Sequence, residues 1–110
     1  MKVKLLFWEG CPSHARALAD LREAMTDLGL DPSEILVREV HTDADAEGEH
    51  FVGSPTIRID GVDIQPPDGE PFGLTCRVYH HRDGRISPTP DQADVRDALA
   101  AAQTNNTERT

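Results

Sequence analysis

The sequence is poor in cysteine, in basic residues and in long apolar runs. Its two cysteines among 110 residues are too few for the disulfide scaffold of a small secreted domain. Lysine and arginine number 11 against 20 acidic residues, which leaves a formal net charge of -9. A surface this acidic repels phosphate backbones and anionic lipid headgroups, so nucleic acid and membranes are not expected partners.

The amino terminus shows no signal peptide and no membrane span. Lys2 and Lys4 lead into a short apolar run, which ends at Glu9. We therefore expect a cytoplasmic protein whose cysteines are kept as thiols. The length and the apolar content of 37% indicate one domain with one core.

Hydrophobic spacing predicts a strand, a helix and a second strand in the first 40 residues. Residues 3–8 are almost continuously apolar, as in a strand buried on both faces. Apolar residues then recur every three or four positions, with Cys11 at the expected N-cap, Pro12 at the first helical position and Gly29 as the stop. Residues 35–40 form the next strand, which a right-handed crossover lays parallel to the first.

A short helix and a hairpin are predicted next. Residues 41–50 are acidic and contain alanine, which favours a short exposed helix. Residues 56–59 alternate as a half-buried strand does. Asp60-Gly61 is a strong two-residue hairpin signal, and it leads into a further strand over residues 62–64.

The remaining residues predict an irregular excursion and a closing helix. Proline and glycine are so frequent from 65 to 88 that long regular elements are excluded, and residues 74–79 form one short strand or an ordered loop. Thr89 is the expected N-cap of the last helix. We therefore assign residues 1–102 to one domain and residues 103–110 to a disordered polar tail.

Together these elements predict an α/β fold with a four-stranded mixed sheet. The order of elements, with Cys11-Pro12 before the first helix and Gly53-Ser54-Pro55-Thr56 before the third strand, resembles the thioredoxin-like superfamily. With the segment Gly73-Leu74-Thr75-Cys76-Arg77-Val78-Tyr79, these motifs are similar to those of small bacterial thioredoxin-like or glutaredoxin-like proteins. Some members of that group are labelled alkylmercury lyases. The resemblance covers residues 3–64 and 89–102.

Cys11 is the candidate catalytic nucleophile. A thiolate is the reactive form of cysteine, and a helix start stabilises it through unpaired N–H groups and the helix dipole. The alternative is a buried cysteine that only packs at the end of the first strand. Thioredoxins carry a second cysteine three residues later, where this chain has His14. His14 is either a catalytic modulator of the thiol or an ordinary exposed helix residue.

The resemblance implies a cis peptide bond between Ser54 and Pro55, facing Cys11. In the superfamily the backbone before this proline pairs with the incoming disulfide. The resemblance therefore assigns substrate binding to Pro12, Ser54, Pro55 and Thr56.

Cys76 is a candidate resolving cysteine. The predicted hairpin returns the chain to the face that holds Cys11, so a loop folded across the helix start brings Cys76 within range of it. Cys76 would then attack a mixed disulfide on Cys11. The alternative is a buried cysteine that alternates with Leu74 and Val78 on one strand face.

Metal binding is a weaker interpretation of the same residues. A zinc site with two cysteines and two histidines is permitted by the spacing of Cys11, His14, Cys76 and His80. His80-His81 before Asp83-Gly84 is more typical of a solvent-exposed hairpin end. We therefore expect no resident metal.

The leading hypothesis is a cytosolic thiol–disulfide oxidoreductase of glutaredoxin size. Its partners would be small-molecule or protein thiols and disulfides, with glutathione as an optional co-substrate and no resident cofactor. Two alternatives stay open: a handler of soft metals or organomercurials that uses both cysteines, and a redox-inactive thioredoxin-like binding module. The sequence leaves the substrate, the reductant and the oligomeric state undetermined.

Overall fold

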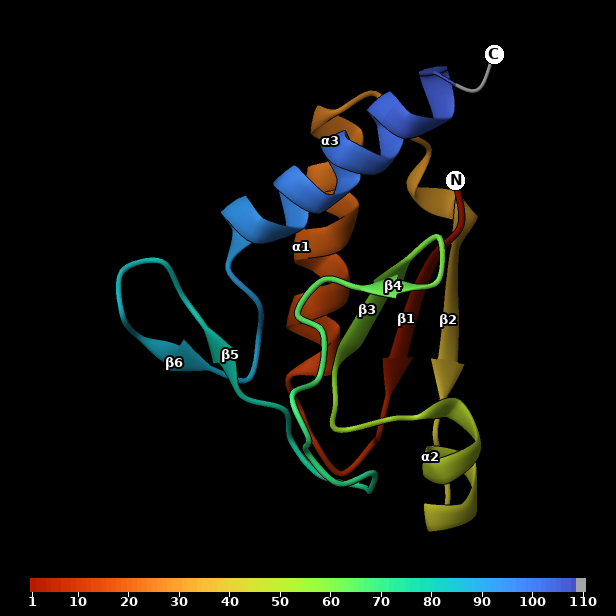
Figure 1. Cartoon of the computed structure of the whole chain (residues 1–110), viewed down its shortest axis with the longest axis vertical. Helices are drawn as coiled ribbons and strands as arrows, with labels where there is room; N and C mark the ends of the chain where they lie inside the picture. The colour runs from red at the N-terminus through yellow and green to blue at the C-terminus, as the bar shows by residue number, and fades with distance from the viewer. Residues whose placement is uncertain (109–110) are drawn as a thin grey trace.

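A four-stranded mixed sheet organises the chain, with its strands in the order β2-β1-β3-β4 (Figure 1). The central strand β1 (Val3–Phe7) runs parallel to β2 (Ile35–Glu39) and antiparallel to β3 (Thr56–Ile59). The edge strand β4 (Val62–Asp63) pairs antiparallel with β3. The computed structural model describes residues 1–108, and within them the predicted mixed sheet is confirmed.

Three α-helices accompany the sheet within residues 1–108. Helices α1 (His14–Asp27) and α3 (Gln92–Glu108) pack against each other on one side of the sheet (Figure 1). Helix α2 (Asp43–Glu49) follows β2, and a 3-10 helix (Pro32–Glu34) precedes that strand. None of the helices in this part of the chain is both long and apolar enough to span a bilayer.

The core lies on both faces of β1, as its continuous apolar sequence predicts. Neighbouring residues of a strand point to opposite faces, and Leu5 and Leu6 are both 0% exposed. Leu6 packs against Val40, Ala46 and Phe51 beneath α2. Leu5 belongs to the main cluster, which joins the sheet to α1 and α3 and contains Val3, Ala17, Leu21, Ala24, Met25, Ile57, Ile59, Val95 and Leu99.

The β3–β4 hairpin turns at Asp60-Gly61, as predicted. Both residues have positive φ, 52° at Asp60 and 84° at Gly61, which is the requirement of a type I′ turn. The Lys2 backbone N–H donates to the Asp60 carboxylate at 2.7 Å, which ties the turn to the start of β1. The hairpin leaves Asp63 on β4 pointing toward the excursion that follows.

The first helix begins later than its sequence suggests. Its N-cap is Ser13, not Cys11, and Pro12 lies in the preceding turn rather than at the first helical position. The Cys11 N–H already donates to the Trp8 carbonyl at 3.0 Å, and the carbonyl of Ser13 accepts the N–H of Ala17 at 3.1 Å. Cys11 therefore lies in the β1–α1 loop, before the helix.

The last helix is displaced in the same direction. It begins at Gln92 rather than directly after Thr89, because the Asp91 carboxylate accepts the N–H of Ala93 at 2.9 Å. The helix also continues to Glu108, through residues that we expected to be a disordered tail, and the side chain of Gln103 donates to the Leu28 carbonyl at 3.0 Å. Residues 109–110 of that expected tail lie outside the described residues.

The excursion contains a small hairpin that stands apart from the main sheet (Figure 1). Its strands are β5 (Tyr79–His80) and β6 (Ile86–Ser87). The turn between them is closed by the His81 N–H, which donates to the Arg85 carbonyl at 2.8 Å, so the expected hairpin end at the two histidines is confirmed. Of the strand considered for residues 74–79, only an isolated bridge between Cys76 and Ser54 forms before β5.

Candidate functional site

Cys11 is buried in the β1–α1 loop, with 0% of its surface exposed. Its thiol donates to the carbonyl oxygen of Ser54, with an Sγ to oxygen distance of 3.5 Å. The reactive atom is thus directed at the loop before β3 rather than at solvent. Cys11 is therefore buried, as the packing alternative expected, and its role as a nucleophile stays a prediction.

The Ser54-Pro55 peptide bond is cis and lies beside Cys11, as the resemblance implied. Every polar atom of Ser54 has a partner within the chain. Its hydroxyl accepts the Trp8 N–H at 3.0 Å, and its N–H donates to the Thr75 carbonyl at 2.8 Å. Its carbonyl accepts the Arg77 N–H at 2.9 Å as well as the thiol of Cys11.

These bonds make Thr75–Arg77 a one-residue parallel bridge on Ser54. Cys76 is the residue that stands opposite Ser54 in this bridge. The backbone edge that the resemblance assigns to an incoming substrate is therefore occupied by the chain itself.

The structure brings the two thiols together. Cys76 is exposed, both residues are free thiols, and Cys76 stands opposite Ser54, whose carbonyl accepts the Cys11 thiol. A side-chain hydrogen bond to Cys11, then partial burial, and then the charge of Cys11 raise the pKa of Cys76 to about 11.

The alternative interpretation of Cys76 as a buried packing residue is wrong. Along this segment the buried residues are Arg77, at 5% exposure, and Tyr79, at 2%. Cys76 and Val78 occupy the other face and are exposed. Sequence alternation identified the two faces but assigned the wrong one to the core, because an arginine occupies the buried position.

His14 is the first residue of α1 and contacts the backbone of Cys11. Its Nδ1 atom lies 2.9 Å from the Cys11 carbonyl oxygen, and its ring stacks on Phe7 with centroids 4.4 Å apart. A carbonyl oxygen only accepts, so Nδ1 holds the proton of this bond. His14 thus bonds to the Cys11 main chain rather than to the sulfur, which favours a role in holding the loop.

The other residues expected to bind substrate differ in their exposure to solvent. Pro12 is exposed beside Cys76, whereas Ser54, Pro55 and Thr56 are buried behind the thiols. The Tyr79 hydroxyl donates to the Pro55 carbonyl at 2.5 Å, and the Thr56 hydroxyl donates to the Gly53 carbonyl at 2.7 Å. These three residues therefore form the floor of the site.

Arg77 is a site residue that sequence reasoning missed. Its guanidinium pairs with both carboxylate oxygens of Asp63, at 3.0 and 2.7 Å, and also donates to the Gln65 carbonyl. Its guanidinium carbon lies 4.9 Å from the centre of the Tyr79 ring. The side chains of the ion pair are only 5% and 9% exposed, so the pair anchors the segment that carries Cys76. No local pattern links an arginine to an aspartate on a separate hairpin.

Gly53 allows the anchored segment to approach closely. A Cβ atom at this position would lie 2.9 Å from both the Cα and the Cβ of Arg77, and the backbone φ of Gly53 is 152°. Both facts require glycine here. The Gly-Ser-Pro-Thr motif therefore supports the placement of Cys76 as well as the floor beneath Cys11.

A shallow groove of about 500 Å³ lies beside the exposed thiol. It is lined by residues of three segments: 12–13, 76–78 and 86–88. Among residues 1–108 no three histidine, cysteine or acidic side chains come together as a metal-binding group.

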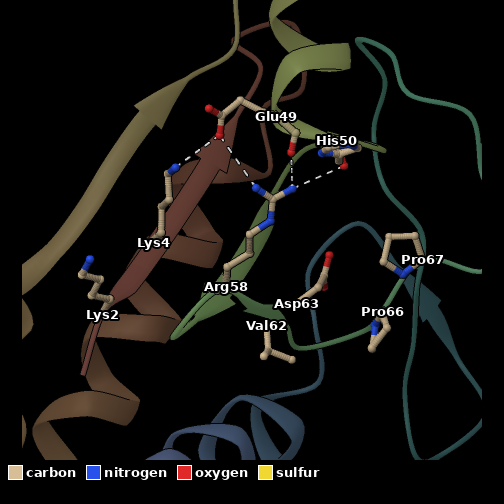
Figure 2. Close-up of a pocket in the computed structure, with 10 residues that line it drawn as sticks. Lys2, Lys4, Glu49, His50, Arg58, Val62, Asp63, Pro66 and Pro67 are labelled. Carbon is tan, nitrogen blue, oxygen red and sulfur yellow. Dashed lines mark hydrogen bonds and ion pairs between the residues drawn. The ribbon is translucent and has the colours of Figure 1, made fainter.

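A second hollow, of about 670 Å³, lies over β1, β3 and the following loop (Figure 2). Three of its charged side chains, Lys4, Glu49 and Arg58, form ion pairs with one another. The carboxylate of Glu49 faces Lys4 at 3.2 Å and Arg58 at 3.8 Å, and Arg58 also donates to the Glu49 carbonyl at 2.6 Å. Burial alone would raise the pKa of Glu49, but the neighbouring cations outweigh it and lower that pKa. We therefore assign these ion pairs a role in stabilising the fold rather than in binding a ligand.

Comparison of the chain with family models, with curated proteins and with solved structures gives no match. The function must therefore be argued from the geometry of the thiol pair. That geometry consists of a buried and an exposed thiol in contact, a floor that supplies a carbonyl, and a groove at the exposed thiol.

Proposed function

We propose that this chain is a thiol–disulfide oxidoreductase with a thioredoxin-like fold, active in the cytoplasm. The observation that carries the proposal is that two free thiols from separate parts of the chain meet at Ser54: Cys76 stands opposite this residue, and its carbonyl accepts the Cys11 thiol. The mixed sheet, the helix that follows Cys11 and the cis Ser54-Pro55 bond beside its sulfur support the fold assignment. Two adjacent free thiols are the reduced half of a dithiol–disulfide couple.

The exposed thiol is the one that a substrate disulfide meets first. The Cys76 thiol loses its proton to water, and the resulting thiolate attacks one sulfur of the substrate. The substrate S–S bond breaks, one substrate thiolate leaves, and a mixed disulfide remains on Cys76. Cys11 is then the resolving thiol.

The second step closes the intramolecular disulfide. The first leaving thiolate, or water, takes the proton from Cys11, and the Cys11 thiolate attacks the Cys76 sulfur of the mixed disulfide. The second substrate thiol is released. Two electrons pass from the cysteine pair to the substrate disulfide, and a low-molecular-weight dithiol must restore the pair by the reverse exchange.

This order reverses the roles expected from the sequence. Cys11 at 0% exposure is closed to a substrate while Thr75–Arg77 remains bridged to Ser54. Cys76 needs no such opening. We therefore assign Cys76 as the attacking residue and Cys11 as the resolving residue.

Intact-mass analysis tests the proposal directly. Treatment of the wild-type chain with diamide should remove two hydrogens from the monomer, and a dithiol should restore them. With a substrate disulfide such as cystamine, Cys11→Ser should accumulate a mixed disulfide on Cys76. Cys76→Ser should react far more slowly, since its remaining thiol is buried. Disulfide-linked dimers without an internal disulfide, or equal adduct formation by both variants, would refute the assignment.

Soft-metal handling is the second candidate, because two adjacent thiols are a donor pair for a thiophilic cation such as Hg(II). The high pKa of Cys76 opposes it, since metal binding must displace that proton. Titration of Hg(II) with pH measurement would decide between the two. Tight binding together with no turnover of any disulfide would favour metal handling over exchange.

A further inference from the structure

The groove beside Cys76 has an apolar wall on the side away from Cys11. Val78 is 52% exposed and Ile86 is 66% exposed, which is high for large aliphatic side chains. Both line the groove, together with Pro12 and Pro88. A group attached to a sulfur that reacts with Cys76 would lie against these side chains.

The groove offers no free charge to a ligand. Arg77 is the charged residue in its lining, and its guanidinium is bound to Asp63 and to the Gln65 carbonyl, with 5% exposure of the side chain. The chain as a whole carries a formal net charge of -9. An anionic substrate therefore meets repulsion at long range and no cation at the site.

The backbone edge beside the groove is closed to an incoming polypeptide. An extended substrate would need the N–H and carbonyl of Ser54, and these already bond to Thr75 and Arg77. Gly53 packs against Arg77 with no space for even a Cβ atom, so the segment is held tightly in this position. A substrate must bind through its side groups alone.

We propose that the groove selects small, uncharged, apolar disulfides over anionic ones and over polypeptides. This inference rests on the proposed thiol–disulfide exchange and specifies its substrate class. Val78 and Ile86 cover the non-reacting group, while Cys76 attacks the sulfur beside it. Glutathione disulfide, with several carboxylates, is then a poor substrate.

Two chromogenic aromatic disulfides provide the test. 4,4′-Dithiodipyridine is uncharged near neutral pH, whereas 5,5′-dithiobis(2-nitrobenzoate) carries two carboxylates. The release of the coloured thiol gives the second-order rate for each, and division by the rate of the same chain in guanidinium chloride removes their intrinsic difference in reactivity. Measurement at about 0.5 M salt screens the net charge, so that a remaining preference reports the groove.

A double substitution locates the preference. Val78→Ser with Ile86→Ser should lower the normalised rate with the uncharged disulfide about tenfold and change the rate with the dianion less than twofold. Val62→Ser is the matched control, since Val62 is 64% exposed and lines the other hollow. If the double variant does not fold, Ile86→Ser alone replaces it, because position 86 is exposed. This single variant should lower the normalised rate with the uncharged disulfide several-fold.

The outcomes separate the two proposals. If the folded chain releases the coloured thiol from neither probe, thiol–disulfide exchange itself is refuted, and the proposed substrate class is refuted with it. If both probes react at equal normalised rates in high salt, or if Val62→Ser has the same effect as the groove variants, the exchange activity stands and the apolar selectivity is refuted. Faster reduction of a peptide disulfide than of dithiodipyridine overturns the selectivity as well.

Discussion

Replacement of Cys11 by alanine should make Cys76 more reactive at neutral pH. The pKa of Cys76 is raised from its ordinary value of 9.0 to about 11, first by its hydrogen bond to Cys11, next by burial, and then by the charge of Cys11. The alanine variant removes the first and third causes and keeps the second. The pKa of Cys76 should therefore fall toward 9.0, which favours the thiolate at every pH below 11.

The size of the effect follows from two opposing changes. A fall of the pKa from about 11 to about 9, the limit reached if burial contributes little, raises the thiolate fraction at about pH 7.5 by about 100-fold. A thiolate of lower pKa is also a weaker nucleophile, by about tenfold for this change with a Brønsted coefficient of about 0.4 to 0.5. The net expectation is an increase of about tenfold in the alkylation rate of Cys76.

Alkylation by iodoacetamide, followed by peptide mass mapping, measures this rate at Cys76 alone. Between about pH 6 and pH 10 the Cys11→Ala rate should level off near the upper end, while the wild-type rate should still be rising. Cys11→Ser is the matched control, because the serine hydroxyl keeps a hydrogen bond to Cys76 but does not ionise in this pH range. An unchanged rate at Cys76 in Cys11→Ala would show that the two side chains are not in contact in solution.

Three further predictions concern the scaffold of the site. Arg77→Met should destabilise the chain by about 3 to 5 kcal/mol in urea unfolding, because it leaves the Asp63 carboxylate buried without a partner, and adding Asp63→Leu should recover much of the loss. Gly53→Ala should lose about 1 to 3 kcal/mol, whereas Gly48→Ala, with open space around it, should lose nothing. Burial would raise the pKa of Glu49, but the neighbouring cations outweigh it and lower that pKa, so the carboxylate stabilises the fold above pH 4.5 and this stabilisation is lost as the pH falls through the lowered pKa. Glu49→Gln should flatten this part of the plot of unfolding free energy against pH. An unchanged plot would refute the role of the carboxylate.

Local sequence patterns predicted the central strand and the hairpin of the sheet. The continuous apolar run over residues 3–8 identified a strand buried on both faces, and the structure places Leu5 and Leu6 in opposite clusters. Asp60-Gly61 identified the hairpin, because positive φ at two successive positions favours these residues. Such signals depend on neighbours in the chain, so they can be recognised without tertiary contacts.

Element boundaries were less predictable. The start of α1 depends on which carbonyl accepts the first helical N–H, and the turn at Cys11-Pro12 moves that start to His14. The end of α3 lies beyond its apolar stripe, where the alanines of residues 100–102 propagate the helix and Gln103 bonds to the Leu28 carbonyl. Both outcomes depend on bonds between segments or within a loop that periodicity does not describe.

The sequence by itself determined the cysteine inventory, the acidic charge and the mixed sheet, since each is set by composition or by spacing along the chain, while the loop that meets Cys11 was implied by the resemblance of its motifs. Only the tertiary structure decided which thiol is exposed. A buried ion pair between Arg77 and Asp63 holds the Arg77 side chain inward, and the neighbouring side chain of Cys76 is exposed. That contact joins residues distant in sequence, and its energy depends on burial, which no local pattern specifies.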